Sequence, residues 1–207
     1  VAATIVVSSG GGEATAGSDY TGVNQTLTFA AGQTQQTVQV AIGQDSALES
    51  NETFSLTLSS PSAGNIETAS ASLTINDDDQ STWSIAANAS APIDEGAGSS
   101  SFTVTRSGAT NNSATVVVNA GGGSATGGMA NDYDNTQRTL TFAAGETAKV
   151  ISVSINNDLL LESVETFNAS LTSVSTGVVD SAAASATVTL MDNDNVIWAV
   201  VADAQSI

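Results

Sequence analysis

Acidic side chains recur at a fixed spacing along this 207-residue chain. Asp19 matches Asp132 and Asp45 matches Asp158, each 113 positions apart, and neighbouring glutamates keep the same spacing. Several carboxylates with no positive partner repel one another, so a bound cation would stabilise such groups. Fourteen of the 21 acidic residues lie in these loop clusters. They are Asp19, Asp45, Glu49, Glu52, Asp77, Asp78 and Asp79 in the first half, and Glu95, Asp132, Asp158, Glu162, Glu165, Asp192 and Asp194 in the second.

The residue types present narrow the identity of that cation. The chain contains no histidine and no cysteine, which excludes thiol catalysis, disulfides and ordinary zinc sites. Oxygen ligands alone suit a hard ion, and Ca²⁺ accepts about six to eight of them. Mg²⁺ requires a stricter octahedron and is the weaker choice. The sequence therefore predicts Ca²⁺.

Composition indicates a folded chain and excludes some partners. The formal charge is −18, yet charged residues make up only 12% and hydrophobic residues 41%, unlike a disordered acidic chain. With three basic residues, the chain cannot contact many phosphates, so nucleic acid is excluded. An anionic membrane surface is excluded too, unless a cation bridges, and no apolar run approaches the roughly 20 residues that span a bilayer.

A repeated segment shows how the chain is organised. Residues 26–32 (TLTFAAG) return unchanged at 139–145, which makes the repeat domain-sized. Alternating polar and apolar residues within and around it predict half-buried strands, among them 26–29, 37–42, 54–58, 72–75, 102–104, 115–118, 150–155 and 186–190. Many short strands separated by turns are typical of antiparallel sandwiches. We predict an all-β chain of two tandem sandwiches, 1–79 and 83–195, joined by a linker at 80–82.

The ends of the sequence do not coincide with the expected boundaries of the modules. Residues 83–87 open the second module with a tryptophan, and residues 198–202 repeat that pattern 115 positions later. Residues 4–7 correspond instead to 115–118, well inside the second module. We therefore expect a first module without its opening strands, in a piece of a longer protein. Residues 196–207 are expected to begin a further module, or to be donated to an identical subunit as a strand.

Four segments together resemble one known family. They are residues 16–20 (AGSDY), 27–32 (LTFAAG), 45–54 (DSALESNETF) and 77–79 (DDD). The combination resembles the Calx-beta domain, found in sodium–calcium exchangers, integrin beta-4 and bacterial surface proteins. The resemblance implies a seven-stranded immunoglobulin-like sandwich that binds Ca²⁺ at one end. It implies the fourteen acids above as ligands, with the carbonyl groups of Ala47 and Leu160.

The chain departs from that family's ion-rich members in ways that imply fewer ions. Gln44 and Asn157 stand where those members have aspartate, and Asn193 replaces the middle aspartate of the closing triplet. Two simpler roles for the acids stay open. They could only confer solubility, or Glu49, Glu52 and their equivalents could cap loops by accepting backbone N–H groups.

The expected function is a structural, Ca²⁺-dependent module of an extracellular or cell-surface protein, an adhesin or fibre, with Ca²⁺ stiffening the module junctions. A regulatory Ca²⁺ sensor is the alternative. A glycosidase that uses two carboxylates is a third possibility. Because the same acids occur twice, at domain ends, we expect no enzyme. Neighbouring modules or identical subunits are the expected partners.

Overall fold

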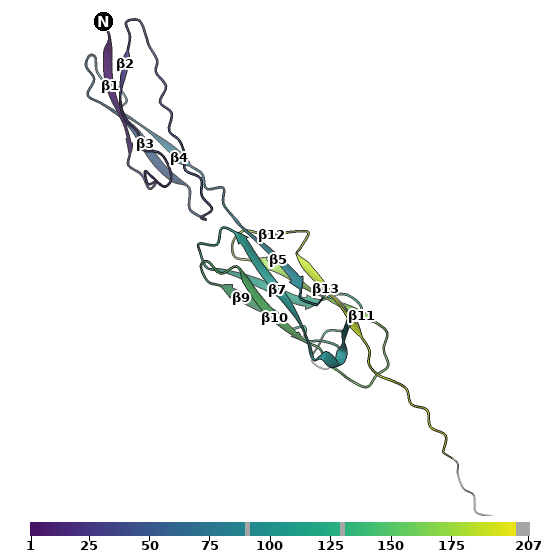
Figure 1. The fold of residues 1–207 in the computed structure, drawn as a ribbon. Coiled ribbons are helices and arrows are strands. Elements are labelled where there is room, and N and C mark those ends of the chain that lie inside the picture. Colours follow the sequence, from purple (N-terminus) through teal and green to yellow (C-terminus); the bar gives the residue numbers. More distant parts are fainter. Residues whose placement is uncertain (90–91, 129–130, 202–207) are drawn as a thin grey trace, which may run out of the picture. The chain divides into compact units, whose positions relative to one another are not determined.

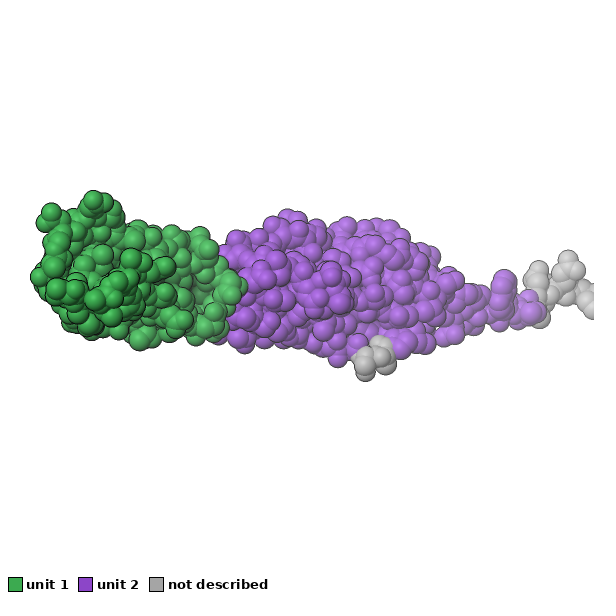
Figure 2. All heavy atoms as spheres, turned by 90° about the horizontal axis from the view of Figure 1, so that it is seen from above, with its two compact units in different colours: residues 1–79 green, residues 80–207 purple. Residues whose placement is uncertain are grey.

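The computed structural model describes residues 1–89, 92–128 and 131–201 (Figure 1). The chain divides into two compact units, Val1–Asp79 (unit 1) and Gln80–Ile207 (unit 2), coloured green and purple in Figure 2. Nearly all regular structure is β, and the described residues contain one short 3-10 helix. None of the helical structure in the described ranges is long and apolar enough to cross a membrane. The predicted all-β fold with antiparallel sheets is confirmed, and unit 2 is a sandwich of two sheets.

Unit 2 consists of two sheets. The first has the order β10-β7-β5-β12 and the second β6-β13-β11-β8-β9. Their pairs are antiparallel except β12 with β5 and β13 with β6. The elements are β5 (Ser81–Ala87), β6 (Ile93–Asp94), the 3-10 helix η1 (Glu95–Ala97), β7 (Ser99–Gly108), β8 (Ala114–Gly121), β9 (Arg138–Phe142), β10 (Ala148–Ser154), β11 (Glu165–Val174), β12 (Val178–Val179) and β13 (Ser185–Met191).

Alternation along these strands builds one continuous core between the two sheets. In β8 and β7 every second side chain is buried, as expected for strands with one face covered. Trp83 of β5 lies edge-on to Phe142 of β9, with ring centroids 4.9 Å apart. Arg106, also buried, lies over the Trp83 ring and donates to the Ser81 hydroxyl and to the Ala109 carbonyl. The guanidinium is thus hydrogen-bonded where it is buried, which offsets the cost of removing it from water.

Unit 1 forms one four-stranded sheet in the order β2-β1-β3-β4. Its strands are β1 (Ala3–Gly10), β2 (Asn24–Phe29), β3 (Glu52–Ser59) and β4 (Ser70–Ile75). This sheet repeats β9-β8-β11-β13 of unit 2: Ala3 faces Phe29 across the β1–β2 pair as Ala114 faces Phe142 across the β8–β9 pair. Within residues 1–79 nothing corresponds to β5 or β7.

The missing strands explain one wrong prediction. Residues 37–42 were expected to form a strand, but only Ile42 pairs, in a single bridge to Tyr20. In unit 2 the equivalent strand β10 pairs with β7 over seven residues. Unit 1 has no counterpart of β7, so an alternating sequence has no backbone partner there. Strand propensity alone does not make a strand when the ladder lacks its second member.

The linker expected at 80–82 is also shorter than predicted. Ser81 and Thr82 belong to β5, because the buried Ser81 hydroxyl donates to the Ala109 carbonyl and Thr82 pairs with Ser107. Residues 196–201, expected to be a strand, form no strand in the described chain. Residues 202–207 of the same prediction lie outside the described residues.

Candidate metal centre

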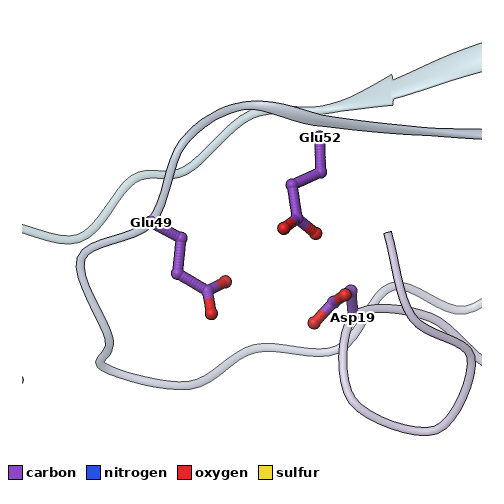
Figure 3. Close-up of side chains that lie close together, drawn as sticks. All are labelled: Asp19, Glu49 and Glu52. Carbon is purple, nitrogen blue, oxygen red and sulfur yellow. The ribbon is translucent and has the colours of Figure 1, made fainter. Parts of the chain in front are cut away.

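Three carboxylates of unit 1 converge from two segments that are distant in sequence. Figure 3 shows Asp19, Glu49 and Glu52 directed toward one another, and each offers an oxygen within 4.8 Å of the others. They lie along a cavity of about 100 Å³, whose lining also contains Asp45, Asp77, Asp78 and Asp79. The structure thus brings all seven acids predicted for this unit to one place.

Local backbone contacts place Asp19. Its side chain accepts from the Thr15 N–H, and its carbonyl accepts from the Gly43 N–H at 2.8 Å. The next residue, Tyr20, is buried and stacks on Phe54 at 4.2 Å between ring centroids. The Asp-Tyr pair therefore combines a side chain anchored in the core with a carboxylate that is a candidate metal ligand.

Unit 2 repeats this arrangement with the equivalent residues. Asp132 accepts from the Thr126 N–H, and Tyr133 stacks on Phe167 with centroids 4.4 Å apart. Oxygens of Asp132, Glu162 and Glu165 lie within 4.8 Å of one another. Two independent copies of the cluster on the same scaffold argue against a chance gathering of surface acids.

The closing aspartates organise the loops around the clusters. One oxygen of Asp192 accepts from the Glu162 N–H at 2.9 Å, and the other accepts from the Asp194 N–H at 2.8 Å. Asp77 makes the same two contacts with Glu49 and Asp79, at 3.1 and 3.3 Å. These aspartates fix where their neighbours point, so the capping role considered for the glutamates belongs to Asp77 and Asp192.

A second cluster is found in unit 2. Glu95, Asp192 and Asp194 also have oxygens within 4.8 Å of one another. A cavity of about 10 Å³ is lined by members of both clusters, among them Glu95, Asp132 and Glu165. Glu95 begins η1, which Asp94 caps by accepting from the Gly96 N–H. In unit 1 this second cluster has no equivalent of Glu95, because the strand that would precede it is not in residues 1–79.

Glu95 carries the strongest sign of a missing partner. Its side chain is only 6% exposed, and its Oε1 atom is buried without a hydrogen bond, as is Oδ2 of Asp194. A buried carboxylate oxygen without a donor is costly, and the groups facing Glu95 are themselves acids. A cation bound by these oxygens would satisfy both of them.

The pKa values of the clustered glutamates also reflect burial next to other acids without a positive partner. Removal from water raises the pKa of Glu95, and the negative charges of Asp192 and Asp194 raise it further. Desolvation, followed by neighbouring carboxylates, raises the pKa of Glu49 and of Glu162 in the same way. By contrast the Thr15 N–H lowers the pKa of Asp19. In unit 1, hydrogen bonding thus favours the charged form of Asp19, whereas the charged form of the adjacent Glu49 is disfavoured.

Amide side chains replace carboxylates at the outer edge of both sites. In unit 2, Asn193 donates to Asp94 and to Asn157, each at 2.8 Å. In unit 1, Gln44 donates to Asp78 at 2.8 Å. An amide N–H here supplies the positive end that a cation would otherwise supply, which favours fewer ions than a fully acidic edge would bind.

Four further predicted ligands lie outside the three carboxylate clusters. Asp45 lines the unit 1 cavity and accepts from the Ala47 N–H at 2.7 Å, as Asp158 accepts from the Leu160 N–H at 2.7 Å. Asp158 lies outside the lining of the small unit 2 cavity, yet its charge contributes to the raised pKa of Glu95. Neither Ala47 nor Leu160 lines a described cavity, so their carbonyl groups remain predicted ligands.

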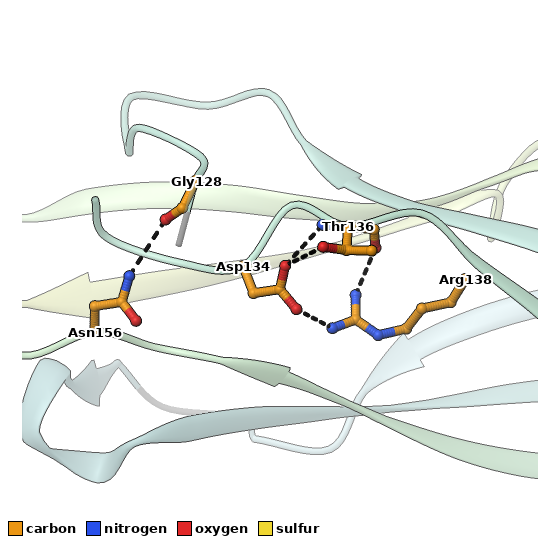
Figure 4. A network of polar contacts seen from close by, with 5 residues as sticks. All are labelled: Gly128, Asp134, Thr136, Arg138 and Asn156. Atoms are coloured by element: carbon orange, nitrogen blue, oxygen red, sulfur yellow. Dashed lines mark hydrogen bonds and ion pairs between the residues drawn. The ribbon is translucent and has the colours of Figure 1, made fainter. Parts of the chain in front are cut away.

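Some residues that support the site were not predicted from the sequence. Asp94 was not singled out, although an aspartate just before a buried glutamate is a helix-capping signal. Figure 4 shows a second support: Asp134 accepts from Thr136 and pairs with Arg138 at 2.7 Å, while Asn156 donates to the Gly128 carbonyl. These contacts hold the loop that carries Asp132. Asp134 is thereby an acid with a cation partner, unlike the clustered ones.

The donor set fits a hard divalent cation. Each cluster offers carboxylate oxygens from segments that are distant in sequence, and the cluster of Glu95, Asp192 and Asp194 contains two buried oxygens without a hydrogen bond. Histidine and cysteine do not occur in the sequence. Ca²⁺ tolerates such irregular arrangements of oxygens, whereas Mg²⁺ requires a near-ideal octahedron.

Comparison with solved structures gives three similarities. The chain is similar to the apo form of the Calx CBD1 domain, with 22% identity and a TM-score of 0.49, over 56% of this chain and 100% of that one. It is similar to CBD12 from CALX1.2, with 19% identity and a TM-score of 0.46, over 91% of this chain and 87% of that one. The calcium binding domain CBD12 of CALX1.1 matches with 24% identity and a TM-score of 0.40, over 84% and 68%.

The family assignment comes from the sequence model of the Calx-beta domain. It matches the chain twice, over residues 2–79 and 77–194. The two matches cover almost the whole of both units and include every acid of the clusters described above. The chain therefore belongs to the Calx-beta family and carries two copies of its domain.

Proposed function

We propose that the chain is a Ca²⁺-binding module pair, with one binding region at the acid clusters of each unit. The observation that carries the proposal is Glu95, a buried carboxylate with an unpaired oxygen that faces two further acids. Ca²⁺ would supply the positive charge for which the clusters have no protein partner. Loop positions are already set by backbone hydrogen bonds to Asp77 and Asp192, so binding needs little reordering.

Calorimetric titration of chelator-treated protein with Ca²⁺ tests this proposal. The double variant Glu162→Gln, Glu165→Gln removes two charges from the Asp132 cluster of unit 2 and leaves unit 1 unaltered. We expect it to lose the unit 2 binding event and keep that of unit 1. Glu67→Gln is the control, since Glu67 belongs to none of the three clusters. Absence of heat and of any bound ion at millimolar Ca²⁺ in the unaltered chain would reject the proposal.

The cellular role proposed first is structural, in a repetitive extracellular or cell-surface protein. Its support is the domain-sized repeat and a surface whose charge is almost entirely negative. A regulatory sensor is the second candidate, and the pre-set loops favour it, because little ordering cost raises affinity. The two roles predict different affinities: about 10⁻⁷ to 10⁻⁵ M for a sensor and about 10⁻⁴ to 10⁻³ M for an extracellular module. The same titration therefore separates them.

A further inference from the structure

In unit 2 an early segment of the chain lies beside the last strand of the same sheet. The short strand β6 pairs in parallel with β13, with Ile93 opposite Leu190 and Asp94 opposite Met191. All other strands of unit 2 except β5 lie between these two in sequence. β6 forms one edge of its sheet, and β13 is its neighbour there. This pair therefore connects two segments that enclose most of the sequence of unit 2.

The direction of the pair decides how it responds to tension. In parallel strands the start of one lies beside the start of the other, so the start of β6 and the end of β13 lie at opposite ends of their ladder. Tension on those two points slides the strands past each other, and the hydrogen bonds between them must break together. Tension at the same end of both strands would instead peel the bonds apart one after another, which requires less force.

Side-chain contacts extend the connection beyond the ladder. The side-chain N–H of Asn193, just after β13, donates to the carboxylate of Asp94 at 2.8 Å. The same amide donates to Asn157 at 2.8 Å. At Gly96 a Cβ atom would lie 2.7 Å from the Asn193 amide nitrogen and 2.9 Å from an Asp94 oxygen. The segment after β6 thus packs closely against the segment after β13.

The cluster of Glu95, Asp192 and Asp194 lies at the same junction. Glu95 directly follows β6, whereas both aspartates follow β13. Oxygens of the three side chains lie within 4.8 Å of one another, and Glu95 Oε1 and Asp194 Oδ2 are buried without a hydrogen bond. Without a cation the three negative charges repel one another and oppose the pairing of the two segments. A cation coordinated by these oxygens would instead join the segments directly.

We propose that β6, β13 and the Glu95 cluster form a clamp that holds unit 2 together against tension along the chain, and that Ca²⁺ bound at this cluster strengthens the clamp. The strengthening rests on the Ca²⁺ binding proposed above, whereas the clamp itself does not. A load carried by the chain enters before β6 and leaves after β13, because the chain continues on both sides of these strands. The inferred function is therefore load-bearing, with a strength that depends on the surrounding Ca²⁺ concentration.

Force spectroscopy on the 207-residue chain tests the clamp without metal. The chain contains no cysteine, so two introduced cysteines attach the handles at defined points. Ala89→Cys with Val196→Cys loads β6 and β13 from opposite ends of their ladder. Ala97→Cys with Val196→Cys loads the same strands from one end, and all three positions are exposed. In chelator we expect unfolding at a fixed force to be at least about tenfold slower in the first geometry, because several hydrogen bonds must then break in one step. Asn193→Ala should reduce this difference.

The Ca²⁺ arm uses the first geometry, with chelator and with millimolar Ca²⁺. Bound Ca²⁺ should slow forced unfolding by at least a further factor of about ten. Glu95→Gln should lose most of this effect, because it removes the only carboxylate that the cluster takes from the β6 side. Glu146→Gln is the matched control, since Glu146 pairs with Lys149 outside the clusters, and it should respond to Ca²⁺ like the unaltered chain.

Calorimetric titration of the same chains separates this proposal from the proposed function. Bound Ca²⁺ without any change in the rate of forced unfolding would overturn the strengthening and leave the proposed function standing. Absence of bound Ca²⁺ would reject the proposed function and the strengthening with it. Equal unfolding rates for the two geometries in chelator would overturn the clamp itself, whether or not Ca²⁺ binds.

Discussion

At the level of single residues, the site depends on charges that lack partners. Most acids outside the clusters are satisfied: Glu13 accepts from the Thr53 hydroxyl, Asp134 pairs with Arg138 and Glu146 pairs with Lys149. Glu95 differs, because it is buried, unpaired and next to two aspartates. Its substitution should therefore have opposite effects with and without Ca²⁺.

We predict that Glu95→Gln stabilises the metal-free protein and destabilises the Ca²⁺-loaded one. The raised pKa means that the folded state holds the Glu95 proton more tightly than the unfolded state, whose value is near 4.5. Stability is therefore lost as the pH rises from 4.5 through the raised pKa, and the penalty is complete above that raised pKa. With chelator at pH 7, the variant should gain about 1–3 kcal/mol in the free energy of unfolding.

Melting curves at several pH values measure the predicted gain in stability with chelator and the predicted loss with Ca²⁺. The gain in chelator should disappear below pH 4.5, where Glu95 is protonated in both states. Glu67→Gln, which removes the same charge from unit 1, serves as the control. A variant that is less stable than the unaltered chain in chelator at pH 7 would show that Glu95 has a favourable partner without metal.

At the level of elements, the sequence predicts which strands exist but not all of their pairings. Alternation correctly locates β2, β3 and β4, because each has an apolar face and an available neighbour. It fails at 37–42, where the alternation is equally clear and the neighbouring strand is missing. Repetition also located the ligand loops. It could not identify Asp77 and Asp192 as backbone acceptors, since that role depends on how two distant loops meet.

We predict that the amides of residues 35–41 exchange with solvent much faster than those of β10. Seven residues of β10 pair with β7, whereas the unit 1 segment has one backbone bridge, at Ile42. Hydrogen exchange followed by mass spectrometry measures both segments in one sample. Equal protection in the monomeric chain would mean that residues 35–41 have a backbone partner that the sheet order does not contain.

At the level of the whole molecule, the chain of 207 residues has a formal net charge of −18, and three of its acids end unit 1. Asp77 and Asp79 lie at the end of unit 1, and Ser81 already belongs to the first strand of unit 2. Very little chain separates the unit 1 site from the next strand. Neutralising these aspartates should therefore restrict the connection between the units.

We predict that Ca²⁺ narrows the range of distances between the two units. Small-angle scattering of the chain compares chelator with millimolar Ca²⁺. The maximum dimension and its spread should change on Ca²⁺ addition and return with chelator. Asp77→Asn together with Asp79→Asn should abolish the response. An identical scattering profile in both conditions would limit Ca²⁺ to a local role in each unit.

Differential scanning calorimetry of the chelator-stripped chain, with and without Ca²⁺, tests the central claim most directly. Ca²⁺ that binds only the folded state should stabilise each binding unit by about 2.7 kcal/mol at a hundredfold excess over Kd. We therefore expect the transitions of both units to move upward by several degrees, with a much smaller shift in equal Mg²⁺. Transitions that stay in place at millimolar Ca²⁺ would show that the clustered acids are not a calcium site.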